Sequence, residues 1–233
     1  MSKKIAIITA RGGSKRIPRK NIKEFCGKPI ISYSIEAAIQ SGVFDEVMVS
    51  TDDNEIAAIA KKYGACVPFM RSGLTSSDYA TTKDVLLEVI EQYQKLGKNY
   101  DYMCCIYPTA PFVSADKLKK SIEMIEEKKV QQIMPIVEYS FPPQRSNIID
   151  DNGEVQYKFP ENRQTRSQDL ESWYHDAGQF YVYDVEKFIQ TEGICTQILP
   201  IIVSELEVQD IDNEIDWKLA EIKYKLMLME KKR

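Results

Sequence analysis

The fold is decided by one stretch near the start of the chain, KIAIITARGGSKRIPRKN, which spans Lys4–Asn21. Its first part, Lys4–Thr9, is a short run rich in β-branched residues, which is typical of a buried parallel strand. A long polar loop follows, and Pro29 then opens an amphipathic helix that runs through Gln40, with Gly42 as its stop. This order of strand, loop and helix predicts the first unit of an α/β sheet.

The same alternation continues along most of the chain. Further strands are predicted at Val47–Ser50, Tyr102–Tyr107, Ile133–Val137, Gln179–Tyr183 and Ile198–Val203. Helices are predicted at Glu55–Tyr63 (capped by Asp52 or Asp53), from Thr81 or Thr82 to about Leu96, from Ser114 to about Lys129, at Val185–Gln190 and at Glu214–Glu230. The pattern predicts a doubly wound α/β fold with a mainly parallel sheet.

Composition excludes several classes of protein. The 233 residues, 43% hydrophobic, suffice for one large α/β domain or two small ones, and the net charge of −4 argues against a broadly basic nucleic-acid binder. No run resembles a signal peptide or a membrane span, so a cytoplasmic protein is expected. The five scattered cysteines are interpreted as reduced packing residues, with Cys104 and Cys105 on opposite faces of a strand.

The regular alternation breaks between Glu138 and Tyr174. This segment contains two proline sites and an Asp-Asn-Gly turn at Asp151–Gly153, where a hairpin is expected. It is too short for a core of its own, and one interpretation is a surface flap. Its many aromatic residues favour packing against a second subunit.

The loop after the first strand is strongly basic. Between Arg11 and Lys23 it carries six cations and no acid, namely Arg11, Lys15, Arg16, Arg19, Lys20 and Lys23. Ligands of open α/β sheets bind beyond the carboxyl ends of strands, and the backbone of Gly12, Gly13 and Ser14 can approach phosphate oxygens closely. The sequence is neither a Walker A loop nor G-x-G-x-x-G. A polyphosphate site is predicted; the alternative is a solvated basic loop.

A second charged segment, Glu205–Asp216, is acidic. It holds six carboxylates and no cation, and in an extended chain Asp210 and Asp212 emerge on one face. Such a pair suits Mg²⁺ shared with substrate phosphates. The alternative is that Asp212 or Asn213 caps the last helix. If the predicted fold is right, the acidic and basic segments meet at one edge of the sheet.

Three other loops follow strand ends and are candidate ligand contacts. Ser50–Asp53 can serve as a helix cap, 71–82 is rich in donors and acceptors, and Pro108–Pro111 is a rigid turn. The single histidine, His175, excludes most histidine-based metal sites and catalytic triads.

These motifs, taken in order, closely resemble those of the CMP-sialic acid synthetases, cytidylyltransferases for nine-carbon ulosonic acids. The resemblance covers essentially the whole chain and is carried by Ile8-x-Ala-Arg-Gly-Gly-Ser-Lys15 with Lys20-Asn21, Val49-Ser-Thr-Asp52, Arg71 with Asp78, Pro108-Thr-x-Pro111 and Asp210-Ile-Asp212. Within the family, Arg166-Ser-Gln-Asp-Leu and His175-Asp-Ala-Gly-Gln-Phe-Tyr are most similar to the bacterial pseudaminic acid cytidylyltransferases.

The resemblance implies a three-layer, Rossmann-like nucleotidyltransferase fold as one domain over 1–233, with an inserted dimerisation and sugar-contacting segment at 138–175. It implies transfer of CMP from CTP to an ulosonic acid, with Mg²⁺ and a homodimer. The implied nucleotide-binding residues are Ala10, Arg11, Gly12, Gly13, Ser14, Lys20, Asn21, Arg71, Ala80 and Thr82. The implied sugar contacts are Tyr107, Thr109, Gln179 and Arg166, the last reaching a partner's site. The metal ligands would be Asp210 and Asp212, which would act in catalysis together with Arg11 and Lys20.

Two departures from the family pattern bear on the acceptor. Tyr107 stands where the sialic acid enzymes usually have glutamine, and Ala177 replaces an asparagine near the same pocket. Both disfavour N-acetylneuraminate and leave the CTP half intact. The alternatives are a CMP-legionaminate or CMP-N-acetylneuraminate synthetase, another nucleotidylyltransferase acting on a different sugar, and a non-catalytic nucleotide-binding protein.

Overall fold

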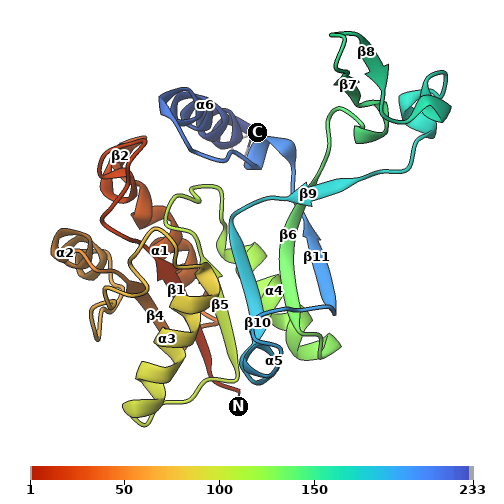
Figure 1. Ribbon diagram of the computed structural model, residues 1–233. Coiled ribbons are helices and arrows are strands. Elements are labelled where there is room, and N and C mark those ends of the chain that lie inside the picture. Colours follow the sequence, from red (N-terminus) through yellow and green to blue (C-terminus); the bar gives the residue numbers. More distant parts are fainter. Residues whose placement is uncertain (1, 231–233) are drawn as a thin grey trace.

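A seven-stranded mixed sheet forms the centre of the computed structural model, which describes residues 2–230 (Figure 1). Its strands are β1 (Lys4–Thr9), β4 (Glu46–Ser50), β5 (Tyr102–Ile106), β6 (Gln132–Glu138), β9 (Tyr174–Asp176), β10 (Phe180–Asp184) and β11 (Ile198–Ile202). They follow the order β11-β6-β10-β5-β1-β4, with β9 paired to the end of β6. Five of these strands run in one direction, so the predicted mainly parallel α/β sheet is confirmed.

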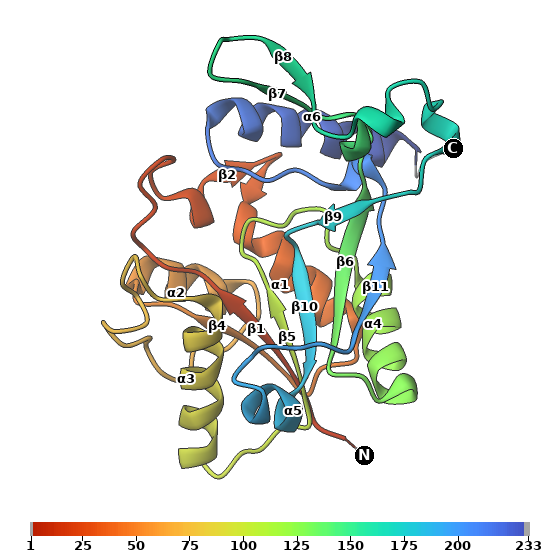
Figure 2. The same cartoon turned by 45° about the vertical axis from the view of Figure 1, so that its right-hand side comes forward.

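Strand β10 is the difference from a fully parallel sheet. It lies antiparallel between β5 and β6 (Figure 2), with Phe180 opposite Ile106. The chain leaves β6 at the carboxyl edge of the sheet and returns through β9 at the same edge. It must therefore cross the sheet in the opposite direction. The periodicity of the sequence predicts the strand but not this orientation.

Helices cover both faces and give three layers. The helices are α1 (Ile30–Ser41), α2 (Asn54–Lys62), α3 (Thr82–Lys95), α4 (Ala115–Lys128), α5 (Val185–Gln190) and α6 (Glu214–Glu230). One apolar cluster joins α1, α2 and α4 to the sheet face that carries Cys104, and another joins α3 and α5 to the face that carries Cys105. The two neighbouring thiols thus point to opposite faces, as predicted, and all five cysteines are free.

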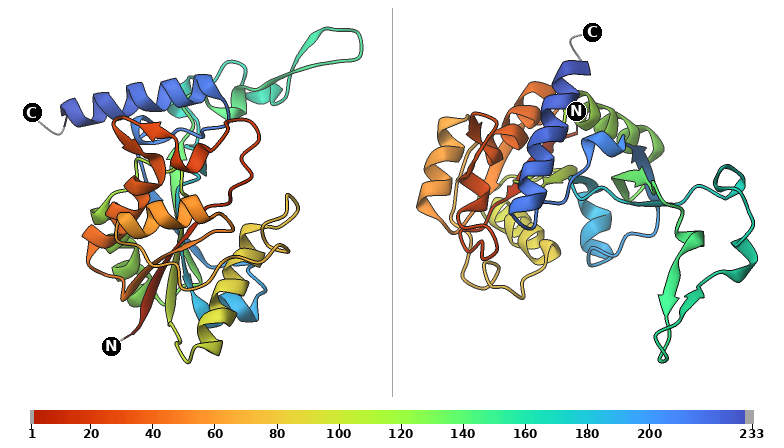
Figure 3. Two further views of the ribbon diagram at one scale, coloured as in Figure 1. Left: turned by 90° about the vertical axis from the view of Figure 1, so that its left-hand side faces the viewer. Right: turned by 90° about the horizontal axis from the view of Figure 1, so that it is seen from above.

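A third apolar cluster lies beyond the carboxyl edge of the sheet. The loop after β1 contains a small hairpin of β2 (Glu24–Phe25) and β3 (Lys28–Pro29), and the ring of Phe25 packs edge-on against Trp217 of α6. Helix α6 lies across this end of the molecule (Figure 3). The sequence predicts only a polar loop here, because the alternation of strand and helix does not reveal that Ile17 and Phe25 are buried under a distant helix.

Side-chain caps begin the helices that flank the site. Asp53 accepts hydrogen bonds from the backbone amides of Glu55 and Ile56, and Thr81 forms a reciprocal capping box with Asp84. Ser114 caps α4. Each cap comes from a residue that the sequence predicts.

Residues 139–173 form an arm that projects away from the body of the molecule (Figures 1 and 3). It carries the predicted hairpin, made of β7 (Asn147–Ile149) and β8 (Val155–Tyr157). Several of its apolar side chains are solvent-exposed, with 88% of Phe141 and 75% of Ile149 accessible. Among residues 2–230, no helix combines the length and apolar character needed to cross a membrane.

Candidate active site

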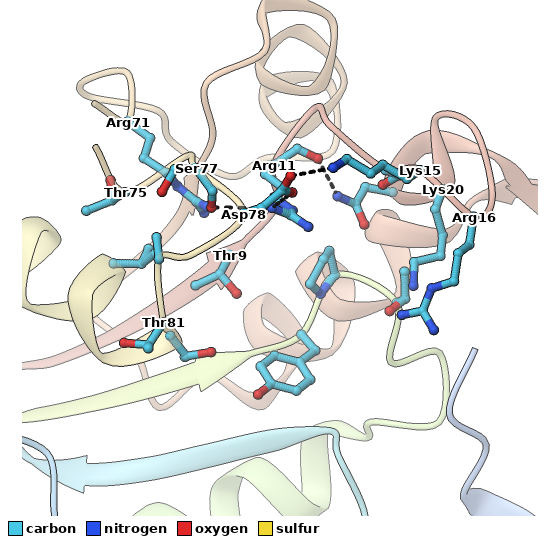
Figure 4. Close-up of a pocket in the computed structure, with 18 of the residues that line it drawn as sticks. Thr9, Arg11, Lys15, Arg16, Lys20, Arg71, Thr75, Ser77, Asp78 and Thr81 are labelled. Atoms are coloured by element: carbon cyan, nitrogen blue, oxygen red, sulfur yellow. Dashed lines mark hydrogen bonds and ion pairs between the residues drawn. The ribbon is translucent and has the colours of Figure 1, made fainter. Parts of the chain in front are cut away.

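A cavity of about 460 Å³ opens beyond the carboxyl ends of β1 and β5 (Figure 4). The basic loop lines one side and the 71–82 loop with the start of α3 lines the other. Seven of the residues predicted for the nucleotide lie on its wall, namely Arg11, Ser14, Lys20, Asn21, Arg71, Ala80 and Thr82. Lys15 and Arg16 add two further cations. The cavity therefore suits a ligand that carries several negative charges and a further polar group.

Partly buried hydrogen bonds hold the basic loop in place. The buried Asn21 donates from Nδ2 to the carbonyl of Arg11 at 2.8 Å, and Lys20 Nζ donates to the carbonyl of Ile211 at 2.7 Å. Burial lowers the pKa of Lys20, while the carboxylates of Asp212 and Asp210 act in the opposite direction. The loop is thus organised before any ligand arrives, which reduces the entropy that binding must overcome.

Ala10, Gly12 and Gly13 are predicted at the nucleotide, but none of them lines the cavity. Ala10 is buried in the core, and the amide of Gly12 donates to Asp52 at 2.9 Å. A Cβ atom on Gly12 would lie 2.8 Å from Asp53 Oδ2. Gly12 is therefore needed for its close approach to the β4–α2 turn. The glycine pair predicts close backbone packing, but not which group is approached.

Arg71 anchors the far side of the cavity. Its side chain is almost buried and donates from Nε to Ser50 Oγ at 3.0 Å and from a terminal nitrogen to the carbonyl of Ser50 at 2.6 Å. Burial lowers the pKa of Arg71, and the nearby carboxylate of Asp52 opposes this effect. The start of the 71–82 loop is thereby fixed to the end of β4.

Asp78 connects the two sides of the cavity. One carboxylate oxygen lies 2.9 Å from an Arg11 terminal nitrogen, and the other lies 2.5 Å from Lys15 Nζ (Figure 4). These contacts hold the pKa of Asp78 below its ordinary value. The family resemblance includes this aspartate, but the sequence assigns it no role.

The acidic segment meets the basic loop, as the sequence predicts. Asp212 Oδ1 lies 2.7 Å from Arg16 and 4.0 Å from Lys20 Nζ. The alternative in which Asp212 caps the last helix is wrong. Asn213 Oδ1 accepts the backbone amides at the start of α6 at 2.8 and 3.0 Å, so the side chain of Asp212 remains directed at the cations.

A second hollow of about 530 Å³ adjoins the first, and Tyr107 and Thr109 line both. Its wall carries the carboxylates of Glu138, Asp176, Glu205 and Asp210. Among the described residues that line it, Lys223 is the single cation, and its Nζ donates to the carbonyls of Glu205 and Val208. Among the described residues that line the second hollow, no cation is therefore free to bind an anionic ligand.

Two residues predicted for the sugar lie elsewhere. Gln179 is buried, with only 3% of its surface exposed, and donates to the carbonyl of Glu207, so it supports the wall of the second hollow from behind. Arg166 lies on the exposed arm and pairs with Asp169. Neither of them is among the residues that line these two hollows.

The sequence missed the arrangement on the floor between the hollows. The ring of Tyr107 packs edge-on against Tyr181, with 5.5 Å between centroids, and the Tyr181 hydroxyl donates to Asp176 at 2.8 Å. In the sequence, Asp176 stands out only through the family resemblance, and His175 only through that resemblance and as the single histidine. Their position beside the end of β6 depends on the antiparallel pairing of β9, which local patterns do not reveal.

Residues 5–199 match a family model described as cytidylyltransferase. The chain belongs to the cytidylyltransferase family. The pseudaminic acid cytidylyltransferase of Campylobacter jejuni subsp. jejuni is 43% identical over 96% of this chain and 97% of its own length. The CMP-N,N'-diacetyllegionaminic acid synthase of Legionella pneumophila is 31% identical over 93% of this chain and 94% of its own. The resemblance recognised in the sequence is thus confirmed at the level of the family.

A solved structure of low sequence identity shares the fold of this chain. The CMP:2-keto-3-deoxy-manno-octonic acid synthetase complexed with CTP superposes with a TM-score of 0.67 over 98% of this chain and all of its own, at 19% identity. At that identity the likeness concerns the fold. It confirms the Rossmann-like nucleotidyltransferase architecture that the resemblance implies.

Proposed function

We propose that this chain transfers CMP from CTP to the anomeric hydroxyl of a nine-carbon ulosonic acid, with release of pyrophosphate, and that pseudaminic acid is its acceptor. The observation that carries the proposal is the junction of the two hollows at Tyr107 and Thr109. One hollow has the cations for a triphosphate, and the other has room for a sugar. The similarity to the Campylobacter jejuni enzyme over almost the full length of both chains supports the acceptor.

In this proposal the first hollow holds CTP. Arg11, Ser14 and Lys20 contact the phosphates, Asn21 supports the loop and the ribose, and Arg71, Ala80 and Thr82 surround the cytosine edge. The placement is supported by the lining of the cavity, where Lys15, Arg16 and Lys20 lie at one end and the buried Arg71 lies at the other (Figure 4). A triphosphate would lie against the basic loop and direct its α-phosphorus toward the second hollow.

Asp210 and Asp212 fit a divalent cation between the hollows. Asp210 lines the second hollow, and Asp212 faces cations of the first. No group of three or more metal-ligating side chains occurs within residues 2–230, so the ion would take its remaining ligands from phosphate and water. Mg²⁺ held there would neutralise phosphate oxygens and so would favour attack at phosphorus.

The reaction itself depends mainly on positioning and charge. The anomeric hydroxyl attacks the α-phosphorus of CTP, and pyrophosphate leaves on the opposite side. Arg11 and Lys20 stabilise the negative charge that grows on the leaving pyrophosphate. Because Lys20 is partly buried and held by the carbonyl of Ile211, its charge acts in a medium that screens poorly.

The acceptor carboxylate requires a cation that the second hollow does not offer. Lys223 is engaged by backbone carbonyls, and the other charged residues on the wall are acidic. We propose that Arg166 on the arm of a second subunit supplies this cation, which makes the active form a homodimer. The exposed apolar side chains of the arm, such as Phe141 and Ile149, support burial against a partner.

Five free thiols support a reducing compartment, the cytoplasm, as the place of the reaction.

The decisive experiment measures pyrophosphate release from CTP with pseudaminic, legionaminic and N-acetylneuraminic acids in parallel. We expect pseudaminic acid to give the highest kcat/KM of the three acceptors. Preference for legionaminic or N-acetylneuraminic acid would overturn the acceptor and keep the reaction. Binding of CTP without pyrophosphate release from any acceptor would overturn the reaction and favour a nucleotide-binding protein.

A further inference from the structure

Asp78 places a carboxylate on two of the cations that face the nucleotide cavity. Its two oxygens separately contact Arg11 at 2.9 Å and Lys15 at 2.5 Å, so the contact spans both cations as a phosphate group would (Figure 4). Asp78 itself lines the cavity. In this state the single negative charge of Asp78 offsets part of the positive charge of Arg11 and Lys15.

The rest of the 71–82 loop explains how Asp78 reaches this position. The start of the loop is fixed, because Arg71 is bound to Ser50 and Glu88 of α3 accepts from the amide of Ser72 and the hydroxyl of Thr75. Beyond Thr75, contacts to the basic loop come from Asp78 and from the carbonyl of Ser77, which accepts from Arg11 at 3.4 Å. The carboxylate is therefore the main tie between the far part of this loop and the basic loop.

We propose that Asp78 is a positioning residue that holds the phosphate-binding cations in the absence of nucleotide and is displaced by the phosphates of CTP. The proposal rests on the placement of the triphosphate beside Arg11 and Lys15 given above. The carboxylate occupies both cations when no nucleotide is bound, and a more highly charged phosphate group outcompetes it. When pyrophosphate leaves, the carboxylate returns to the same two cations and so promotes its release.

The proposal predicts that loss of the Asp78 carboxylate tightens ligand binding, whereas loss of an ordinary supporting contact weakens it. Removing the charge of Asp78 removes a competitor, so CTP and pyrophosphate should bind more tightly to Asp78→Asn. A residue that merely shaped the site would weaken binding when it is changed. Because exposed ion pairs are individually weak, we expect the Kd for both ligands to fall by roughly 2- to 10-fold.

The experiment measures Kd by titration calorimetry for CTP, pyrophosphate and cytidine, with Mg²⁺ and without acceptor, so that no turnover occurs. Cytidine carries no phosphate, and its Kd should be the same in the wild type and in Asp78→Asn. Glu91→Gln is the matched control, since Glu91 is an exposed carboxylate on the neighbouring helix α3 that pairs with Lys95 and not with Arg11 or Lys15. It removes one negative charge from the same side of the molecule and should leave all three Kd values unchanged.

Unchanged or weaker binding of CTP and pyrophosphate by Asp78→Asn would overturn the proposal, as would equal tightening by Glu91→Gln. Thermal unfolding of both variants checks that each is folded, which the exposure of both side chains favours. A wild-type protein that binds no CTP would instead overturn the proposed function. The two failures are therefore distinguishable.

Discussion

Asp212 and Asn213 are neighbours in the chain with different structural environments. Asn213 caps α6, whereas Asp212 directs its carboxylate at Arg16 and Lys20. Sequence patterns place both at the start of a helix and do not show which of the two side chains caps it. The structure separates them because only one side chain turns back onto the helix.

This difference predicts that one of two adjacent substitutions lowers the reaction rate and the other lowers the stability of the fold. Asp212→Ala should lower the rate of pyrophosphate release by about 10²–10³-fold, as loss of one charge-stabilising group typically does, with little change in stability. Asn213→Ala should lower the free energy of unfolding by about 1 kcal/mol with little change in rate. Initial rates and urea unfolding of both variants test this pair. The assignment fails if Asp212→Ala turns over at the wild-type rate.

Gly12 and Gly13 offer a second matched pair at the residue scale. A methyl group on Gly12 would meet Asp53, which caps α2 and also binds Arg19, whereas nothing lies within 4 Å of a methyl group on Gly13. Gly12→Ala should therefore lower the free energy of unfolding by roughly 1–3 kcal/mol, as overpacking typically does. Gly13→Ala should change it little. Equal stabilities of the two variants in urea would contradict this explanation for Gly12.

Glu46, at the start of β4, joins this strand to α3 and the segment after it. Its carboxylate accepts hydrogen bonds from Tyr100 at 2.8 Å and from Lys98 at 2.6 Å, and also from Tyr93 and Cys66. Burial acts to raise the pKa of Glu46, but these hydrogen bonds outweigh it and lower the pKa to about 2. The cluster lies at the opposite end of the sheet from the active site, so it concerns stability alone.

The lowered pKa predicts a pH-dependent contribution to stability. The unfolded chain binds a proton on Glu46 near pH 4.5 and the folded protein only near pH 2. The stabilisation is therefore complete above pH 4.5 and is lost as the pH falls toward 2, with a total of about 3 kcal/mol for a side chain this little exposed. Urea unfolding of the wild type and Glu46→Gln across this range tests the prediction. The variant should lose less stability on acidification; parallel pH profiles would contradict it.

Single elements were the most predictable part of the fold. The caps at Asp53, Thr81 and Ser114 and the stop at Gly42 depend on a few neighbouring residues, and the structure has each of them where the sequence predicts. The orientation of β10 was not predictable in this way. It depends on where the arm returns the chain to the sheet, which no local pattern encodes.

On the scale of the whole molecule, the arm and the second hollow are each incomplete. The arm presents exposed apolar side chains and Arg166, while the hollow lacks a free cation among the residues described on its wall. A symmetric dimer in which each arm reaches the other subunit would satisfy both requirements at once. The proposed dimer thus explains why Arg166 lies far from the cavity of its own chain.

Shared sites predict complementation between variants. Heterodimers of Arg166→Ala with Asp212→Ala, purified through two different tags, contain one intact site and one that lacks both residues. Two-fold symmetry then predicts about half of the wild-type activity, although each homodimer is nearly inactive. Heterodimers of Asp210→Ala with Asp212→Ala are the control and should stay inactive, because both changes lie in the body of the subunit. Equal activity of the two heterodimers would show that Arg166 does not act across subunits.

The sequence by itself determined the alternation of strands and helices, the capped helix starts, the family, and the two oppositely charged segments that form the site. These features depend on local periodicity, on short-range hydrogen bonds and on motifs in a given order. Only the tertiary structure decided that Lys20 contacts Ile211, that Asp78 rather than solvent meets Arg11 and Lys15, and that Gly12 packs against Asp53. Those contacts join residues between 41 and 191 positions apart, so they depend on how the sheet and its covering helices bring distant loops together.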